Sequence, residues 1–310
     1  MSSNFKLFYT SNTEKLGKEV ASILNVPVGK YHSQKFSDGE VFVRFDESVR
    51  GQTIFILAQA NMPYSNLFEL FLAVDAARRA SVEEIICVVP YLPHSRQERK
   101  DKDRTSIASR VVADFLQDVG VNRLITIDLH TNSIEGFYKI HVDHLDTSKV
   151  FIPHIKENFQ ENLCLCSPDF GGLKRIKKYK NELNSDMAVI HKERLKPNQI
   201  SNMEILGDVS GKNVVIIDDM VDTAGTLCKA ADLIIQSGAL SVSAYCTHAI
   251  LSGNAKEKIE NSALKNLYVC DTFPNIEVND KIKIISCAPL LATAIRHINE
   301  NKSIKEYYEG

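Results

Sequence analysis

Short apolar segments rich in β-branched residues alternate with segments of helical periodicity along the whole chain. This alternation predicts an α/β protein, in which mostly parallel sheets are flanked by helices on both faces. The predicted strands are Lys6–Tyr9, Thr53–Leu57, Ile85–Val89, Leu124–Ile127, Met187–Ile190, Val214–Ile217, Ser241–Cys246, Leu267–Cys270 and Ile282–Ser286. The predicted helices are Glu14–Leu24, Asn66–Arg79, Ile107–Gln117, Leu227–Ser237 and Leu290–Asn299. Because the run Val214–Ile217 is apolar throughout, it is expected to be a central strand buried on both faces.

The chain of 310 residues is long enough for two domains of roughly 150 residues each. Two segments, LITIDLHTNSIEG (124–136) and VVIIDDMVDTAGT (214–226), share one plan. In both, an apolar strand is followed by an aspartate, a polar loop and the start of a helix. This internal similarity indicates a duplicated domain. We expect one domain over residues 1–145 and a second over residues 146–310.

The charge balance of the chain limits the classes of partner that it can bind by bulk electrostatics. Lys and Arg number 37 and Asp and Glu 39, for a net charge of −2, which argues against a protein that binds nucleic acid or an anionic membrane by bulk electrostatics. A local site for a small anion remains compatible with this balance. No apolar segment is long enough to span a membrane, and the N-terminal MSSNFKLFYTSNTEK lacks the apolar region of a signal peptide. Seven scattered cysteines without a CxxC pair are typical of reduced residues in a cytoplasmic protein.

The segment VVIIDDMVDTAGTLCKAADLI (214–234) is the strongest candidate for a functional site. A buried strand brings Asp218 and Asp219 to its carboxyl end, where α/β proteins place ligands. The small residues 222–226 then open a helix whose free N–H groups can bind a phosphate. Adjacent carboxylates beside a phosphate suit sugar hydroxyls and Mg²⁺-bound water. The alternative is that Asp222 or Thr223 only caps the helix.

Two N-terminal segments carry polar residues that could bind a nucleotide. In FSDGE (36–40) acidic residues flank a glycine, which is also the pattern of a simple hairpin turn. In PYLPHSRQERKDKDR (90–104), Arg96 and Gln97 follow a strand and could hold a phosphate or a base, although a charge run is more often a solvated surface. GDVSGKN (207–213) is one residue too short for a GxxxxGK[ST] loop, and no GxGxxG is present, so ATP binding has to come from other residues.

Three further segments place charged groups after strands. His130 in IDLHTNSIEGF (127–137) could hold a metal or its water, or be structural. Asp169 in SPDFGG (167–172) precedes two glycines whose backbone could wrap a diphosphate. IHKERLKPNQ (190–199) presents Lys192, Arg194 and Lys196 on a loop, which could equally be solvated.

Taken together and in order, these segments resemble the ribose-phosphate diphosphokinase (PRPP synthetase) family over essentially the whole chain. The segments that carry the resemblance are FSDGE, ESVRG (47–51), RQERK, DLH, SPDFGG, HKER and VIIDDMVDTAGT. The last is also the signature loop of type I phosphoribosyltransferases. The other segments distinguish the diphosphokinases from these relatives.

The resemblance implies two phosphoribosyltransferase-like domains with an active site assembled between domains and subunits. The family transfers the β,γ-diphosphoryl group of Mg·ATP to the C1 hydroxyl of ribose 5-phosphate, and the products are PRPP and AMP. It also implies a Mg²⁺ cofactor, a homohexamer, activation by phosphate and inhibition by ADP. No nucleic-acid or membrane partner is expected.

Site roles carry over from the matching segments. ATP would be bound by Phe36, Asp38, Gly39, Glu40, Arg96 and Gln97, with Phe36 against the adenine. His130 and Asp169 would serve the magnesium and diphosphate end, and Lys192 and Arg194 would be catalytic. Ribose 5-phosphate would be held by Arg194, Asp218, Asp219, Asp222, Thr223, Ala224, Gly225 and Thr226.

The chain departs from the family pattern near the nucleotide segments. Lys139 stands where many members have aspartate, in a stretch linked to a second cation in some of them. His94 and Ser95 replace a usual Tyr-Ala, and Ser106 replaces a frequent proline. Two alternatives remain. A salvage phosphoribosyltransferase would need only about half of this length, and a regulatory paralogue would bind nucleotide without turnover.

Overall fold

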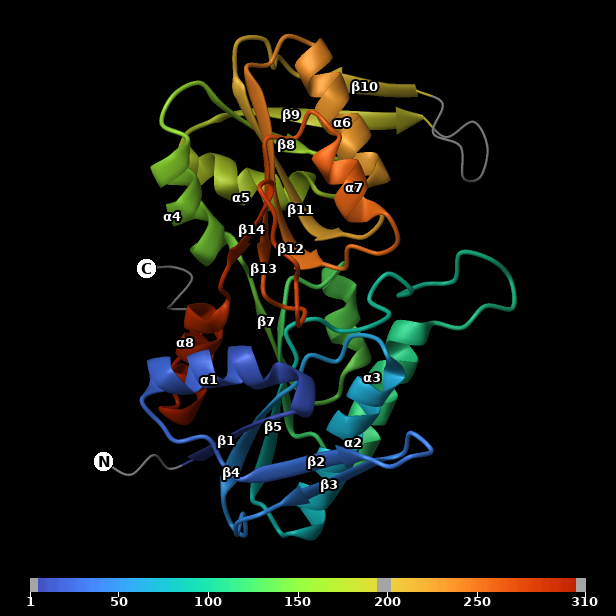
Figure 1. Ribbon diagram of the computed structural model, residues 1–310, viewed down its shortest axis with the longest axis vertical. Coiled ribbons are helices and arrows are strands. Elements are labelled where there is room, and N and C mark those ends of the chain that lie inside the picture. The colour runs from blue at the N-terminus through green and yellow to red at the C-terminus, as the bar shows by residue number, and fades with distance from the viewer. Residues whose placement is uncertain (1–4, 194–201, 305–310) are drawn as a thin grey trace. The chain divides into compact units, whose positions relative to one another are not determined.

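The computed structural model describes residues 5–193 and 202–304 and forms two compact units. Unit 1 contains the chain up to Asp146 together with the residues from Cys287 onward, and unit 2 contains Thr147–Ser286. Each unit has its own mainly parallel sheet with helices on both faces (Figure 1). The predicted α/β class is therefore confirmed.

The sheet of unit 1 has the strand order β1-β4-β5-β6-β7, and all neighbours are parallel. Its strands are β1 (Phe5–Tyr9), β4 (Thr53–Leu57), β5 (Glu84–Val88), β6 (Arg123–Ile127) and β7 (His141–Leu145). On one face lie α1 (Glu14–Leu24) and α8 (Ala288–Asn299), and on the other α2 (Tyr64–Arg79) and α3 (Ala108–Val119), as Figure 1 shows. Two short 3₁₀ helices complete the unit: η1 (Ser11–Thr13) and η2 (Asn132–Phe137).

A separate antiparallel hairpin, β2 (Tyr31–Lys35) with β3 (Val41–Phe45), packs on α2. Its turn is closed by two backbone bonds, from Phe36 N–H to the Glu40 carbonyl (2.8 Å) and from Gly39 N–H to the Phe36 carbonyl (3.0 Å). Gly39 has a φ of +94°, a conformation that a side chain would strain. The FSDGE segment is thus the tip of a hairpin.

The sheet of unit 2 has the order β10-β9-β8-β11-β12-β13-β14, in which only the β9/β10 pair is antiparallel. Its strands are β8 (Leu163–Ser167), β9 (Asp186–Glu193), β10 (Asn202–Leu206), β11 (Asn213–Val221), β12 (Ser241–Ala249), β13 (Asn266–Cys270) and β14 (Ile282–Ile285). Its helices are α4 (Ser148–Asn158), α5 (Leu173–Leu183), α6 (Gly225–Gln236) and α7 (Ala255–Glu260). In β11 the run 214–217 is fully buried, as predicted for a central strand.

The division of the chain differs from the predicted one at the C-terminus. Residues from 287 onward were expected in the second domain, but α8 packs against α1 in unit 1. The apolar face of α8, including Leu291 and Ile295, is buried, and Arg296 Nη2 donates to the Ile23 carbonyl (3.2 Å). This packing joins segments far apart in sequence, so no local pattern could reveal it.

Among the described residues, no helix is both long and apolar enough to cross a membrane.

Replacing Gly29 by alanine should destabilise unit 1. Gly29 N–H donates to the Leu7 carbonyl beside β1 (2.8 Å), and an added Cβ would overlap the ring of Phe8. Phe8 is buried and packs edge-on against Phe45 at 4.8 Å, so the ring has little room to move. Overpacking of this kind costs about 1–3 kcal/mol, which should lower the thermal unfolding midpoint. Gly136→Ala is the matched control, because an added Cβ meets nothing within 4 Å there; equal midpoints for the two variants would contradict this account.

Candidate active site

The carboxyl edge of the unit 2 sheet gathers several of the predicted site residues. Strands β9, β8 and β11 are neighbours and run parallel, so the segments that follow them emerge at one edge. Asp169 follows β8, Lys192 is the second-last residue of β9, and Asp218 and Asp219 lie near the end of β11. This edge therefore carries carboxylates on its central strands and a cation on the neighbouring one.

Arg175 of α5 ties the two aspartates of β11 together. Its Nη1 lies 3.2 Å from Asp218 Oδ1 and its Nη2 lies 3.2 Å from Asp219 Oδ1. Asp219 N–H also donates to Asp218 Oδ1 (2.9 Å), and Asp219 is only 5% exposed. Arg175 cannot be singled out from sequence, because within the run LKRIKKYK it is one cation among several and only the tertiary fold brings it to the aspartates of β11.

The pKa of Asp218 is raised well above its ordinary value. Burial is the main cause, the negative charge of Asp219 adds to it, and the Arg175 guanidinium opposes both. A carboxyl group in this position gains from a hydroxyl or a cation that approaches it. The pair is therefore suited to bind the hydroxyls of a polyol ligand.

The loop after β11 ends at the start of α6, where the first backbone amides of the helix are available to a ligand. The first hydrogen bond within the helix runs from Cys228 N–H to the Ala224 carbonyl (2.9 Å), so the amides at 225–227 have no acceptor inside the helix. Such amides and the helix dipole favour a phosphate. Ala224 holds the turn with a φ of +56°.

The alternative role of this loop, a simple helix cap, is not what the structure shows. The residue at the N-cap is Ala224, and no side chain caps α6 there. The Asp222 carboxylate instead accepts a hydrogen bond from Ser252 Oγ, while Ser252 N–H donates to the Asp222 carbonyl (3.1 Å). Lys258 Nζ donates to the Thr223 carbonyl (3.2 Å). The loop is thus held from outside, and its amides stay available.

The SPDFGG segment forms an ordered turn after β8. Asp169 Oδ1 accepts from Gly172 N–H (3.0 Å), and Ser167 Oγ donates to the Asp169 carbonyl (2.7 Å). A Cβ at Gly172 would overlap Ser167 Oγ, so this turn requires glycine there. Asp169 remains exposed and can still contact a ligand.

Two cations of the HKER segment were predicted to be catalytic, Lys192 and Arg194. Lys192 pairs with Met203 in the backbone register of β9 and β10, whereas Arg194 lies outside the described residues.

In unit 1 the FSDGE residues are exposed at the hairpin tip. Phe36 is 47% exposed, and Asp38 Oδ1 accepts from Glu40 N–H (3.0 Å). The segment therefore forms the hairpin turn that its sequence pattern also allowed. It leaves the Phe36 ring and the acidic side chains free to contact a ligand.

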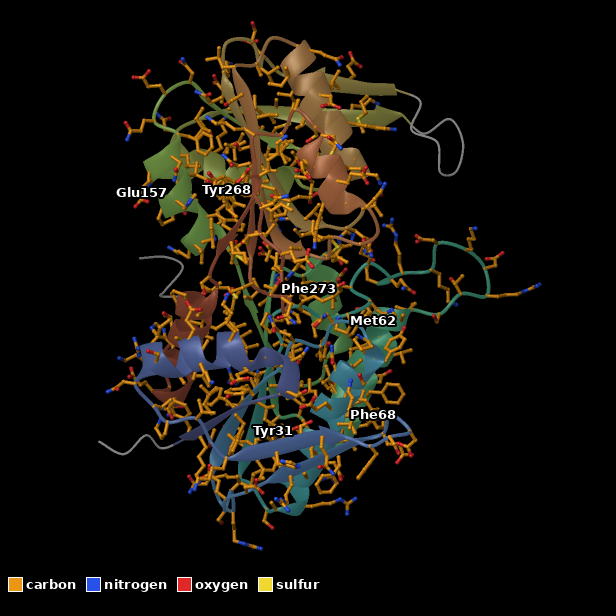
Figure 2. All side chains as sticks on the ribbon, viewed as in Figure 1. Tyr31, Met62, Phe68, Glu157, Tyr268 and Phe273 are labelled. Carbon is orange, nitrogen blue, oxygen red and sulfur yellow. The ribbon has the colours of Figure 1, made fainter. Side chains whose placement is uncertain are left out.

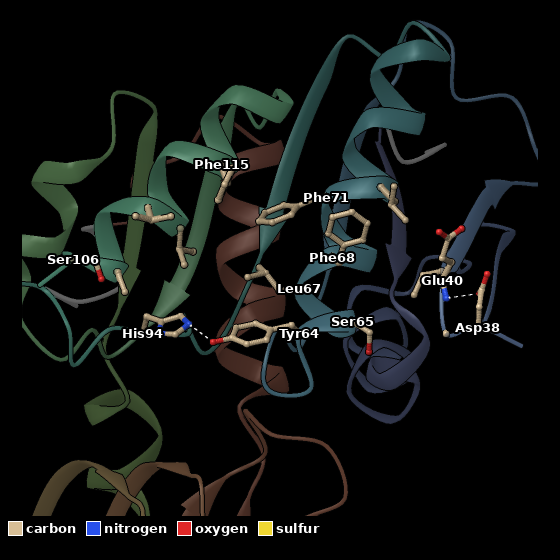
Figure 3. Close-up of a pocket in the computed structure, with 16 residues that line it drawn as sticks. Asp38, Glu40, Tyr64, Ser65, Leu67, Phe68, Phe71, His94, Ser106 and Phe115 are labelled. Atoms are coloured by element: carbon tan, nitrogen blue, oxygen red, sulfur yellow. Dashed lines mark hydrogen bonds between the residues drawn. The ribbon is translucent and has the colours of Figure 1, made fainter. Parts of the chain in front are cut away.

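A groove of about 890 Å³ begins at this tip and runs over α2 and α3. Asp38 and Glu40 lie at one end, and His94 and Ser106 lie at the other, as Figure 3 shows. The floor between them is apolar and comes mainly from Leu67, Phe68, Phe71, Val111 and Phe115. Two of the positions where the chain departs from the family pattern, 94 and 106, thus line this groove.

His94 links the groove to a predicted ATP residue. Its ring stacks on Tyr64 with centroids 5.8 Å apart, and its Nε2 lies 3.2 Å from the Tyr64 hydroxyl. Its Nδ1 lies 3.2 Å from Gln97 Nε2. Arg96, which precedes Gln97 in the chain, is exposed. His130 is half-buried and follows β6, three residues past its end.

Comparison with known proteins identifies the family. A model of the N-terminal domain of ribose phosphate pyrophosphokinase matches residues 5–120, and one of the phosphoribosyl synthetase-associated domain matches residues 193–309. The ribose-phosphate pyrophosphokinase of Porphyromonas gingivalis is 44% identical over 307 residues, with 98% of both chains covered. That of Helicobacter pylori is 42% identical over 305 residues, or 98% of this chain and 96% of that protein. The chain belongs to the ribose-phosphate pyrophosphokinase family.

The fold agrees with this family. The crystal structure of the phosphoribosylpyrophosphate synthetase from Mycobacterium smegmatis matches with a TM-score of 0.91 and 35% identity, covering 96% of this chain and 99% of that one. The predicted family membership and the two phosphoribosyltransferase-like domains are thereby confirmed. The chain is an enzyme of this family, whose name specifies the synthesis of PRPP.

Asp218→Asn should make the protein more stable at neutral pH. Folding raises the pKa of Asp218, so the folded state retains a proton that the unfolded chain has already lost. The free energy of unfolding therefore falls as the pH rises from the ordinary carboxyl pKa, about 4, to the raised pKa of the folded state. The loss is about 1.4 kcal/mol for each unit by which folding raises the pKa. Asparagine cannot ionise and avoids this loss.

The measurement is the free energy of unfolding of variant and wild type between pH 3.5 and 8. The gain should be present at neutral pH and disappear toward pH 4. Asp280→Asn changes an exposed aspartate of the same unit and serves as the control. A difference between Asp218→Asn and wild type that does not vary with pH would rule out the explanation.

Proposed function

We propose that the chain transfers the β,γ-diphosphoryl group of Mg·ATP to the C1 hydroxyl of ribose 5-phosphate, giving PRPP and AMP. The observation that carries the proposal is the end of β11, where a carboxylate pair held by Arg175 lies next to the amides that open α6. The amides bind the 5-phosphate, and Asp218, Asp219 and Asp222 accept hydrogen bonds from the sugar hydroxyls. Thr223 and Thr226 add hydroxyl donors beside the same phosphate.

ATP is assigned to the unit 1 segments. Phe36 would contact the adenine through its exposed ring, and Asp38, Gly39 and Glu40 follow it on the same hairpin tip. Arg96 would neutralise phosphate charge, and Gln97 would donate to the base or to a phosphate oxygen. The exposure of all these residues supports a role in binding, because none is needed in the core.

Magnesium is assigned to the diphosphate end with His130 and Asp169. Among the residues that the structure describes, no three His, Cys, Asp or Glu side chains gather into a metal site. Mg²⁺ commonly keeps its waters and binds through one or two protein groups together with substrate phosphates. The exposed carboxylate of Asp169 fits an ion of that kind, and such an ion would supply neutralisation of the charge on the transferred group.

The remaining chemistry is electrostatic. Diphosphoryl transfer needs alignment of the C1 hydroxyl with the β-phosphorus and neutralisation of the charge that develops there. Lys192, near the end of β9, and Arg194, two residues later in the sequence, would supply that neutralisation. Arg194 would also contact ribose 5-phosphate.

A homohexamer in the cytoplasm, with phosphate as activator and ADP as inhibitor, completes the proposal. Large apolar side chains stand out from unit 1, as Figure 2 shows for Met62 and Phe68, and both are 56% exposed. Apolar exposure of this kind supports burial against another chain. All seven cysteines are buried free thiols, which supports a reducing compartment.

The deciding experiment is an assay for AMP formed from ATP and ribose 5-phosphate in the presence of Mg²⁺ and phosphate. A salvage phosphoribosyltransferase would instead consume PRPP with a free base. A regulatory paralogue would bind ATP and form no AMP. Either result would replace the proposal.

Asp222→Asn should raise the KM for ribose 5-phosphate and leave the KM for ATP nearly unchanged. Losing a charge-assisted hydrogen bond costs about 1.5–3 kcal/mol, or roughly 10-fold to 150-fold in affinity. Ser252→Ala is a graded control, because Ser252 Oγ only orients the Asp222 carboxylate and its loss should have a smaller effect. An unchanged KM for ribose 5-phosphate in Asp222→Asn would show that this carboxylate does not bind the sugar.

Lys192→Ala should lose on the order of 100-fold to 1,000-fold in kcat, as for the deletion of one preorganised donor. Its KM values should stay within a few fold of wild type, because the lysine meets charge that develops only during transfer. Lys177→Ala, an exposed lysine of α5, is the control and should keep wild-type kinetics. A variant with wild-type kcat and a raised KM for ATP would make Lys192 a ground-state binding residue.

A further inference from the structure

One imidazole ring connects three elements of unit 1 beside the DLH segment. His144 lies on β7, next to β6 in the sheet, in register with Thr126. Its Nε2 accepts a hydrogen bond from Leu129 N–H (2.9 Å), and its Nδ1 lies 2.8 Å from Glu135 Oε1 in η2. The His144 side chain is 18% exposed and Leu129 is buried, so the contact between them is largely shielded from water, whereas the Glu135 side chain is 41% exposed.

These two contacts fix which nitrogen carries the proton. A backbone N–H can only donate, so Nε2 of His144 must be the unprotonated, accepting nitrogen. The proton of the neutral ring is then on Nδ1, where it is donated to the Glu135 carboxylate. Glu135 thereby selects the tautomer that His144 needs in order to accept from Leu129.

The backbone that His144 holds is in an unfavourable conformation. Asp128 has a φ of +35°, which few residues other than glycine adopt. Its N–H donates to the Leu145 carbonyl (3.0 Å), and the next amide, that of Leu129, donates to His144. Two successive amides are therefore fixed by β7, and His130 is the residue that follows them. A turn of this kind persists only when its surroundings hold it.

We propose that His144 is a positioning residue, which fixes the Asp128–Leu129 peptide and so places His130 for the diphosphate of ATP. The statement about His130 rests on the proposed function, whereas the hydrogen bond to Leu129 does not. Loss of the acceptor would let the turn relax and move His130 away from its productive place. A displacement of about 1 Å at a reacting centre can cost on the order of 100-fold in rate.

The test uses three substitutions at one position in the full-length protein. In the variant His144→Gln, the glutamine can place its carbonyl oxygen where Nε2 lies. It can therefore still accept the hydrogen bond from Leu129 N–H. In the variant His144→Asn, the shorter asparagine side chain reaches only to the position of Nδ1. It keeps the contact with Glu135 and loses the hydrogen bond from Leu129 N–H. Leu in His144→Leu can do neither. His141→Leu, on the same strand with an exposed side chain, is the control.

Two readouts are measured for each variant: steady-state kinetics, and hydrogen exchange at the Leu129 amide by mass spectrometry. We expect His144→Asn and His144→Leu to lose about 10-fold to 100-fold in kcat, with an unchanged KM for ribose 5-phosphate and faster exchange at Leu129. His144→Gln should keep slow exchange and recover most of kcat. His141→Leu should match wild type in both.

The two readouts separate this inference from the proposed function. Slow exchange at Leu129 in His144→Leu, or wild-type kcat in both His144→Asn and His144→Leu, would overturn the positioning role. Equal loss of kcat in His144→Gln and His144→Leu, with slow exchange kept in His144→Gln, would also overturn it. If the wild type forms no AMP, the proposed function fails, and the exchange pattern alone then decides whether His144 fixes the turn.

Discussion

The contact between Arg175 and the two aspartates of β11 is the interaction on which the carboxyl edge of the unit 2 sheet depends. The strand β11 is buried on both faces over residues 214–217, and the next two residues, Asp218 and Asp219, place two carboxyl groups near its carboxyl end. Without a cation they would repel each other in a poorly hydrated place, and even with Arg175 the pKa of Asp218 stays raised. The fold thus maintains a site that lacks positive charge and hydrogen-bond donors. The hydroxyls of a phosphorylated sugar can supply the donors, and an accompanying cation can supply the charge. The stability lost at Asp218 is a cost of keeping that site ready.

The groove of unit 1 shows how the same scaffold can change its ligand contacts without changing its fold. His94 and Ser106 lie at one end of an apolar floor, and the stack of Tyr64 on His94 leads to Gln97. A histidine can exchange donor and acceptor roles between its two nitrogens, which a tyrosine cannot do. Differences from other members of the family in nucleotide handling are therefore expected to arise at this end of the groove, whereas the hairpin tip that carries Asp38 keeps the family pattern.

The sequence predicted the central strands well, because their burial on both faces produces apolar runs such as 214–217 that few other structures require. It missed strands whose pattern is mixed: β7 contains two histidines and an aspartate, and β8 is built around cysteine and leucine without β-branched residues. Long-range packing was also invisible, which is why α8 was assigned to the wrong domain. For the candidate site, the sequence could point only to residues that belong to contiguous motifs, and these assignments stay predictions; residues that act across the fold leave no such pattern. Arg175 and His144 are each recognisable only from the atoms that they contact.

Residues 124–136 and 214–226 are similar in sequence, but the loops that they form differ in the groups that they offer to a ligand. In both, an apolar strand ends at an aspartate that opens a loop. After β11 the loop leads into α6, a 12-residue α-helix with free amides at its start, and the turn before it is held from outside by Ser252 and Lys258. After β6 the corresponding loop leads into η2, a 3₁₀ helix of six residues, whose amides do not add to a comparable dipole. Of the two related loops, only the one in unit 2 therefore opens an α-helix. In unit 1 the same position offers side chains in its place, with His130 on a turn that an additional histidine keeps in shape, which suits a diphosphate and its cation better than a sugar phosphate.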